Sequence, residues 1–156
     1  MQPGDYFEWD FKNFSNDGFK DIFLDKGGNA PERFDLLLSV PSTKRFKKVL
    51  KFDVFPAPNK IPGTKYYYSY HKNGCADNDW VSDLFYIHDY KAVEIGKIDG
   101  VGCGSDKTPT AIYIFKIKNT KKELLKTLPI DIIIKYRENK WGFIKQYWIK
   151  NYKSFL

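Results

Sequence analysis

Aromatic side chains determine most of what this chain can fold into. Its 156 residues include 13 Phe, 11 Tyr and 4 Trp, whereas methionine occurs only at Met1. Aromatic and β-branched side chains fit the half-buried surface of a pleated sheet. The composition therefore predicts a mainly β protein. Hydrophobic residues make up 42% of the chain, which is enough for a packed core and excludes wholesale disorder.

The length predicts one β-rich domain over residues 1–156, because two domains of half this size would each be marginal. About six to eight short strands with one helix favour an antiparallel β-sandwich or a partly open barrel. An α+β half-barrel, in which one sheet curls around a helix, is the alternative. The N-terminal half, however, shows no long amphipathic helix that would fill such a barrel.

Several strands are recognisable from their apolar or alternating pattern: Arg33 to Val40, Phe46 to Phe55, Lys65 to His71, Val93 to Ile98 and Ala111 to Lys118. Glycine and proline separate them. The stretch from Gly27 to Pro31 is a turn signal, and the prolines between Pro56 and Pro62 predict an extended loop. Trp80 to Tyr90 fits either a strand or a short helix.

The last third of the chain carries the clearest local signal. Thr120 and Glu123 have the spacing of a capping box, and three leucines follow before Pro129, which predicts one short helix near residues 120–128. The alternation from Ile130 to Tyr136, a turn at 138–140 and the segment 141–150 predict a C-terminal hairpin.

Charge is distributed unevenly along the chain. The net charge is +7, and residues 107–156 hold 12 Lys/Arg against 3 Asp/Glu, a balance of +9. Such an excess indicates either an anionic partner or lysines that keep an exposed sheet face soluble. The candidate basic surface comprises Lys44, Arg45, Lys47, Lys48, Lys135, Arg137 and Lys145. Together with a tryptophan, it would form a platform for RNA or single-stranded DNA.

Two cysteines, Cys75 and Cys103, lie in polar, glycine-containing loops. Free cysteines are usually buried among apolar residues, so this placement favours a disulfide, which would stabilise the fold by about 3 kcal/mol. A bridge would favour an exported or periplasmic location. The N-terminus lacks a secretory signal, so the chain is intracellular or a mature exported form. A zinc site of both cysteines with His71 and His88 is an alternative. His71 and Cys75 are four residues apart, a plausible pair, but His88 and Cys103 each lack a short-spaced partner.

Catalytic motifs are largely missing. The glycine-rich loop from Gly96 to Thr108 has Asp106 where a phosphate-binding loop needs glycine before its Lys-Thr pair, and a strand follows instead of a helix. No serine lies in a Gly-x-Ser-x-Gly elbow, and there are two histidines. We therefore expect a protein that is not an enzyme and needs no cofactor or metal. A small hydrolase, with residues brought together only by the fold, is the second alternative.

Tyrosines supply the candidate ligand-binding surface. Tyr66, Tyr68 and Tyr70 share one face of a strand, and Trp80 follows the loop that contains Cys75. We expect these rings and the cysteine loops to recognise a protein or a glycan-like ligand. Nucleic acid is the alternative partner. No apolar run reaches the roughly 20 residues that a membrane-spanning helix needs, and the sequence does not determine the oligomeric state.

Overall fold

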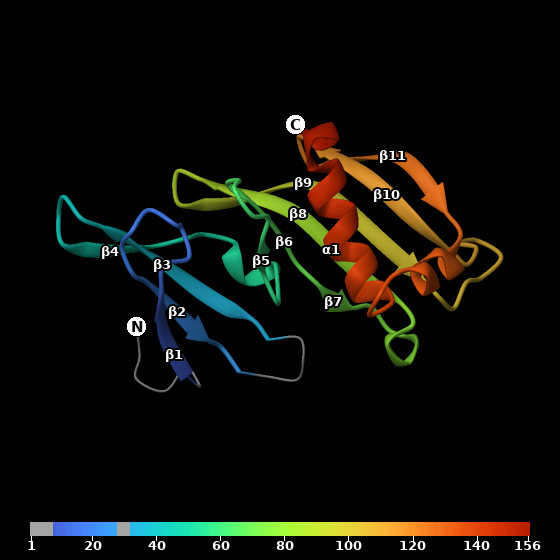
Figure 1. Cartoon of the computed structure of the whole chain (residues 1–156), viewed down its shortest axis with the longest axis horizontal. Helices are drawn as coiled ribbons and strands as arrows, with labels where there is room; N and C mark the ends of the chain where they lie inside the picture. Colours follow the sequence, from blue (N-terminus) through green and yellow to red (C-terminus); the bar gives the residue numbers. More distant parts are fainter. Residues whose placement is uncertain (1–7, 28–31) are drawn as a thin grey trace.

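The computed structural model describes residues 8–27 and 32–156, which form two antiparallel sheets and a C-terminal helix (Figure 1). The predicted mainly β architecture with one short helix is confirmed, and the described strands do not close into a barrel. Most of the turn predicted from Gly27 to Pro31 lies outside the described residues.

The first sheet has four strands in sequence order: β1 (Glu8–Lys12), β2 (Asp21–Asp25), β3 (Phe34–Val40) and β4 (Arg45–Lys48). In the antiparallel pair β2–β3, Phe23 lies opposite Leu36. β3 ends where Pro41 would interrupt its hydrogen bonding, as the sequence predicts.

The second sheet has the order β11-β10-β9-β8-β6-β5, and β7 also pairs with β8. Its strands are β5 (Asn59–Lys60), β6 (Tyr66–Tyr68), β7 (His71–Lys72), β8 (Trp80–His88), β9 (Lys91–Val101), β10 (Ala111–Lys118) and β11 (Lys121–Leu128). All of these pairs are antiparallel.

Four short 3-10 helices and one α-helix complete the described chain. They are η1 (Phe52–Val54), η2 (Cys75–Asp77), η3 (Ile130–Lys135), α1 (Lys140–Asn151) and η4 (Tyr152–Phe155). α1 lies across one face of the second sheet (Figure 1).

The helix predicted near residues 120–128 is wrong, because this segment is strand β11. Asn119 and Thr120 both adopt positive φ, 50° and 65°, and they form the two-residue turn between β10 and β11. Such a turn matches the twist of paired strands, whereas a helix N-cap needs extended backbone. Pairing with β10 therefore overrides the local capping signal.

The predicted C-terminal hairpin is also wrong, because residues 130–135 form η3 and residues 140–151 form α1. Phe143, Ile144 and Trp148 are buried and Tyr147 is half-buried, a spacing of one, four and five residues that belongs to one face of a helix. The turn predicted at 138–140 is present, but it leads into the helix.

The strand predicted from Phe46 to Phe55 is shorter than expected. β4 ends at Lys48, and η1 occupies residues 52–54. Lys51 has a φ of 60°, which breaks the extended conformation. Val49 and Phe52 are nevertheless buried, whereas Val54 is exposed.

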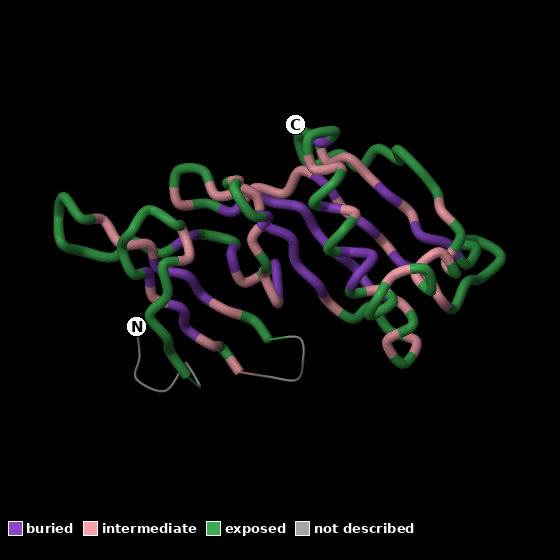
Figure 2. Tube along the Cα trace, in the orientation of Figure 1, coloured by how far each residue is buried: buried purple, intermediate pink, exposed green. Residues whose placement is uncertain are grey.

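The buried residues form two clusters on opposite sides of the second sheet. One cluster joins α1 to the sheet and contains Trp80, Leu84 and Trp148; the other joins the two sheets and contains Phe23 and Phe85. Figure 2 shows the buried positions along β2, β3, β8 and β9, while β4 and most of β11 are exposed. The second sheet therefore packs against a separate small hydrophobic core on each of its two faces.

One edge of the second sheet is strand β11, and the other is the short strand β5. β11 is exposed along most of its length, carries Lys121, Lys122 and Lys126, and contains an extra residue, Leu125, relative to β10. Charges and bulges of this kind discourage another strand from pairing with an open edge.

None of the helices in the described part of the chain has the length and apolar character needed to cross a bilayer.

Candidate functional site

A groove with a volume of about 370 Å³ lies where the N-terminal end of α1 meets two loops of the second sheet. We call it the Trp141 groove. Its walls come from the loop after β7, the loop after β9, η3 and the turn before α1. The lining residues are Asp77, Asn78, Trp80, Gly102, Ile130, Ile133, Glu138, Asn139, Lys140 and Trp141.

The loop after β7 has an unusual backbone. Cys75, Ala76 and Asp77 follow Gly74, and all three have positive φ, at 48°, 48° and 72°. Non-glycine residues rarely adopt this conformation, and each costs roughly 1–3 kcal/mol unless its surroundings hold it. Glu138 and Asn139, on the opposite wall, have φ values of 69° and 52°. Strained backbone therefore converges on the groove from both sides.

A disulfide between Cys75 and Cys103 joins the two sheet loops, with their Cα atoms 6.2 Å apart. The predicted covalent link is therefore confirmed. Asp79 reinforces it, because its Oδ1 accepts hydrogen bonds from the amides of Gly102 (2.8 Å) and Cys103 (2.9 Å). A Cβ at Gly102 would lie 2.6 Å from the carbonyl oxygen of Asn78, so the loops approach as closely as glycine allows.

Asp77 and Lys140 form the polar centre of the groove. Lys140 Nζ lies 2.7 Å from Asp77 Oδ2 and also donates to the Asp77 carbonyl at 2.8 Å. The hydroxyl of Tyr70 donates to Asp77 Oδ1. Burial alone would raise the pKa of the Asp77 carboxyl, but the bonds from Lys140 and Tyr70 outweigh it and lower that pKa. The carboxylate therefore stays ionised and ties the strained loop to α1.

Apolar surface surrounds this polar centre. The Trp141 ring packs against the Tyr70 ring with their centroids 3.9 Å apart, yet 46% of Trp141 is exposed. Ile134 follows the groove residue Ile133 in η3 and is 74% exposed. Two large apolar side chains are thus presented to solvent beside a cross-linked groove.

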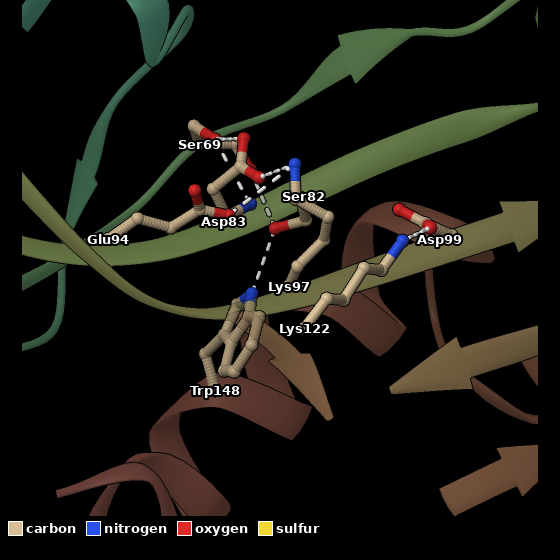
Figure 3. Close-up of polar contacts among 8 residues, drawn as sticks. All are labelled: Ser69, Ser82, Asp83, Glu94, Lys97, Asp99, Lys122 and Trp148. Carbon is tan, nitrogen blue, oxygen red and sulfur yellow. Dashed lines mark hydrogen bonds and ion pairs between the residues drawn. The ribbon is translucent and has the colours of Figure 1, made fainter. Parts of the chain in front are cut away.

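A second polar cluster crosses the middle of the sheet (Figure 3). Lys97 Nζ lies 2.8 Å from Asp83 Oδ1 and 3.4 Å from Glu94 Oε1. Among the described residues, these two oxygens have no other hydrogen-bond partner. The rest of the network runs from Asp83 Oδ2 through Ser69 and Ser82 to Trp148 on α1.

A β-bulge creates this cluster. Leu84 pairs with Gly96 and Phe85 with Glu94, so Ile95 is an extra residue in β9. Glu94 and Lys97, three positions apart, would lie on opposite faces of a regular strand, and the bulge brings them to one face. The alternation of side chains in a regular strand therefore does not predict this cluster from the sequence.

The environment of the cluster alters its acidity. Burial, and then the charge of Asp83, raise the pKa of Glu94 to about 7, against the opposing effect of Lys97. Burial would lower the pKa of Lys97, but the charge and hydrogen bond of Asp83 raise it overall. Because Asp83 is only 2% exposed, a substrate does not reach its carboxylate, and the converging carboxylates form no accessible catalytic pair.

The predicted ligand-binding aromatics lie mostly in the core. Tyr66, Tyr68 and Tyr70 do share one face, as expected, but α1 packs over it. Tyr68, Tyr70 and Trp80 are buried, and the Tyr66 ring is half-buried against Tyr86 and Tyr152. We therefore propose no direct ligand contact for Tyr68 and Tyr70, and Trp80 contributes to the proposed site only as a buried part of the groove lining.

The predicted basic residues do not gather on one surface. Lys44, Arg45, Lys47 and Lys48 belong to the β3–β4 hairpin. The other three lie in the other half of the molecule (Figure 1): Lys135 at the end of η3, Arg137 between η3 and α1, and Lys145 on α1. Lys48 is paired with Asp35 at 2.6 Å. With the C-terminal hairpin replaced by a helix, the surface proposed for nucleic acid is not assembled.

The zinc alternative also loses its ligands. Cys75, Cys103 and Asp79 place their ligand atoms within 4.8 Å of one another, but the two sulfurs are bonded to each other. His88 is the exposed last residue of β8, beside Asp89 in the turn to β9.

The comparisons add a likeness in fold. No family model and no curated protein sequence matches the chain. A solved structure, described as that of a Xanthomonas type IV secretion system related protein, superposes with a TM-score of 0.58 at 14% sequence identity. The match covers 76% of this chain and 57% of that one, so this chain corresponds to little more than half of its neighbour. At this identity the likeness concerns the fold alone.

Proposed function

We propose that this protein is a non-catalytic binding protein that recognises a protein partner through the Trp141 groove. The observation that carries the proposal is the exposure of Trp141 and Ile134 beside a groove that a disulfide cross-links. Exposed tryptophan next to a groove is typical of the few residues that dominate the affinity of a protein interface.

The rigidity of the groove supports this function. The disulfide, the carboxylate of Asp79 and the Asp77–Lys140 ion pair hold its walls before any partner arrives. A preformed surface loses less conformational entropy on binding, so more of the contact energy appears as affinity. The disulfide also supports an exported or periplasmic location, because such bonds persist in oxidising compartments. The secretion-system description of the structural neighbour is compatible with that setting.

A glycan-like ligand is the second candidate. Asn78, Glu138 and Asn139 line the groove beside the exposed Trp141 ring. A flat ring with amide and carboxylate groups around it suits a sugar, whose apolar face stacks and whose hydroxyls form hydrogen bonds. Ile134 and the half-buried isoleucines of η3 favour the protein partner instead.

The chain offers a matched control for the test. Trp9 on β1 is 67% exposed and lies on the other sheet, so Trp9→Ala removes a still more accessible ring without touching the groove. Wild-type protein, Trp141→Ala and Trp9→Ala would be immobilised and exposed to extract of the source cells. Proteins retained by the wild type would be purified and titrated calorimetrically, and an oligosaccharide panel would be titrated in parallel.

We expect a protein partner to bind the wild type and Trp9→Ala equally and Trp141→Ala about thirtyfold more weakly, the scale of one hot-spot residue. Ile134→Asp should weaken binding similarly, whereas Leu124→Asp on exposed β11 should not. Equal losses for Trp9→Ala and Trp141→Ala would refute the site. Binding of an oligosaccharide alone, abolished by Trp141→Ala, would establish the glycan-like ligand instead.

A further inference from the structure

A second cavity, of about 490 Å³, lies between the two sheets and away from the Trp141 groove. We call it the Lys60 pocket. Lys60 comes from β5, Lys65 from the turn before β6, Leu38 from β3 and Ile87 from β8. Its volume falls within the range of small-molecule sites, roughly 300–1,000 Å³.

The ammonium group of Lys60 is held in place by backbone. Its Nζ donates to the carbonyl oxygens of Ser15 (3.0 Å) and Phe14 (3.5 Å). The Phe14 ring in turn stacks on Tyr67 at 4.6 Å, and the Tyr67 hydroxyl donates to the same Phe14 carbonyl. The cation therefore has a fixed position without depending on a flexible side-chain partner.

Lys60 has no ion-pair partner among residues 8–27 and 32–156. Burial lowers the pKa of its ammonium, and the charges of Asp21 and Asp17 offset this only partly. Asp21 itself accepts hydrogen bonds from Ser15 and from the Ser39 amide. A partly desolvated cation that lacks a counter-ion gains most from an anion placed directly against it.

The remaining surface of the pocket has a matching character. The exposed Lys65 also lines the pocket, with its Nζ 5.2 Å from the centroid of the neighbouring Tyr86 ring, and no acidic side chain is among the residues that line the pocket. Leu38 and Ile87 are half-buried and pack against the aromatic core between the sheets. The pocket thus combines two cations with an apolar surface.

We propose that the Lys60 pocket binds a small organic anion, with its carboxylate at Lys60 and Lys65 and its apolar chain against Leu38 and Ile87. A simple oxyanion would use the charges and leave the apolar surface unused. A neutral chain would use the apolar surface and leave the partly desolvated Lys60 ammonium without a counter-ion. An amphipathic carboxylate satisfies both.

The test uses octanoate, octanol and inorganic phosphate as probes of the intact protein. Each would be titrated while amide resonances are followed by NMR. Octanoate should saturate and shift the amides of Ser15, Gly63 and Thr64, with octanol at least about tenfold weaker, the scale of one charge-assisted contact. Equal binding of octanol, or displacement of octanoate by equimolar phosphate, would overturn the proposal.

Charge variants provide the second arm. Lys65→Glu should weaken octanoate binding by about tenfold or more while leaving the fold intact, because Lys65 is exposed. Lys118→Glu, an exposed lysine on β10, makes the same change in net charge outside the pocket and should have no effect. An equal loss of octanoate affinity in both variants would show that the effect comes from the net charge of the protein, and it would refute the site. The Trp141→Ala variant should bind octanoate normally, which separates this pocket from the groove.

Discussion

The indole nitrogen of Trp148 donates a hydrogen bond of 2.8 Å to the hydroxyl of Ser82, and both groups are fully buried. The Ser82 hydroxyl donates a hydrogen bond of 2.6 Å to the Ser69 carbonyl, and the Ser69 hydroxyl donates to Asp83 Oδ2. α1 is therefore fixed to the sheet by hydrogen bonds as well as by apolar contact, at the point where the polar cluster crosses it.

Ser82→Ala should lower the free energy of unfolding by about 2–4 kcal/mol. The substitution leaves the indole N–H of Trp148 and the Ser69 carbonyl buried without a partner, and each such group costs about 1–3 kcal/mol. Chemical denaturation measures the change. Ser154→Ala, at an exposed position, should change stability by less than about 0.5 kcal/mol.

Glu94 should make the protein less stable as the pH rises. Its folded-state pKa of about 7 lies above the ordinary value of 4.5, so the folded chain holds a proton that the unfolded chain releases. The stabilisation is complete below about pH 4.5 and is lost as the pH rises through about 7. Glu94→Gln should remove this dependence.

Denaturation of the wild type and Glu94→Gln across this range measures the effect. Relative to the wild type, the variant should gain on the order of 2 kcal/mol between about pH 4.5 and pH 7.5. Glu123→Gln on exposed β11 controls for the loss of one carboxylate. A constant difference between Glu94→Gln and the wild type would contradict the coupling in the cluster.

Removing the disulfide should cost both stability and binding. The double variant Cys75→Ser/Cys103→Ser should lose about 2–5 kcal/mol of unfolding free energy. Because the link also holds three residues in the left-handed region, partner affinity should fall even at temperatures where the variant is fully folded. Thiol titration of the denatured, unreduced wild type should find no free thiol. Two free thiols would show that the bridge is absent.

Gly100→Ala should be more damaging than Gly96→Ala. A Cβ at Gly100 would lie 2.1 Å from the buried Trp80 ring, whereas at Gly96 the nearest atom, 2.7 Å away, belongs to Phe155 near the chain end. Overpacking in a core costs about 1–3 kcal/mol or more, and the closer approach at Gly100 requires the larger displacement of a buried ring. Thermal unfolding of both variants measures the difference. Equal melting temperatures would contradict this account of Trp80.

The sequence predicts best those strands whose hydrophobic pattern fits a strand and does not also fit a helix. Residues 33–40 and 111–118 follow their expected course because burial and alternation agree there. At 120–128 and 141–150 local signals and tertiary pairing conflict. The turn at Asn119 and Thr120 draws the former segment into the sheet, and the spacing of Phe143, Ile144 and Trp148 makes the latter a helix.

The candidate sites were harder to predict than the fold. The pairing of Cys75 with Cys103 follows from their loop placement, but the groove depends on Trp141 and Lys140 meeting a loop more than sixty residues earlier. The Glu94–Lys97 contact depends on a bulge that period-two reasoning does not reveal. Both arise from tertiary geometry, which a single sequence expresses only indirectly.

The lysines and the extra residue of β11 have a consequence for handling the protein. An open edge strand is a template on which further chains can add, and here mainly positive charge and an irregular backbone oppose that growth. Acetylation of these lysines would remove the electrostatic part of this protection. The chain would then be prone to assemble into fibrils while its two cores were still intact.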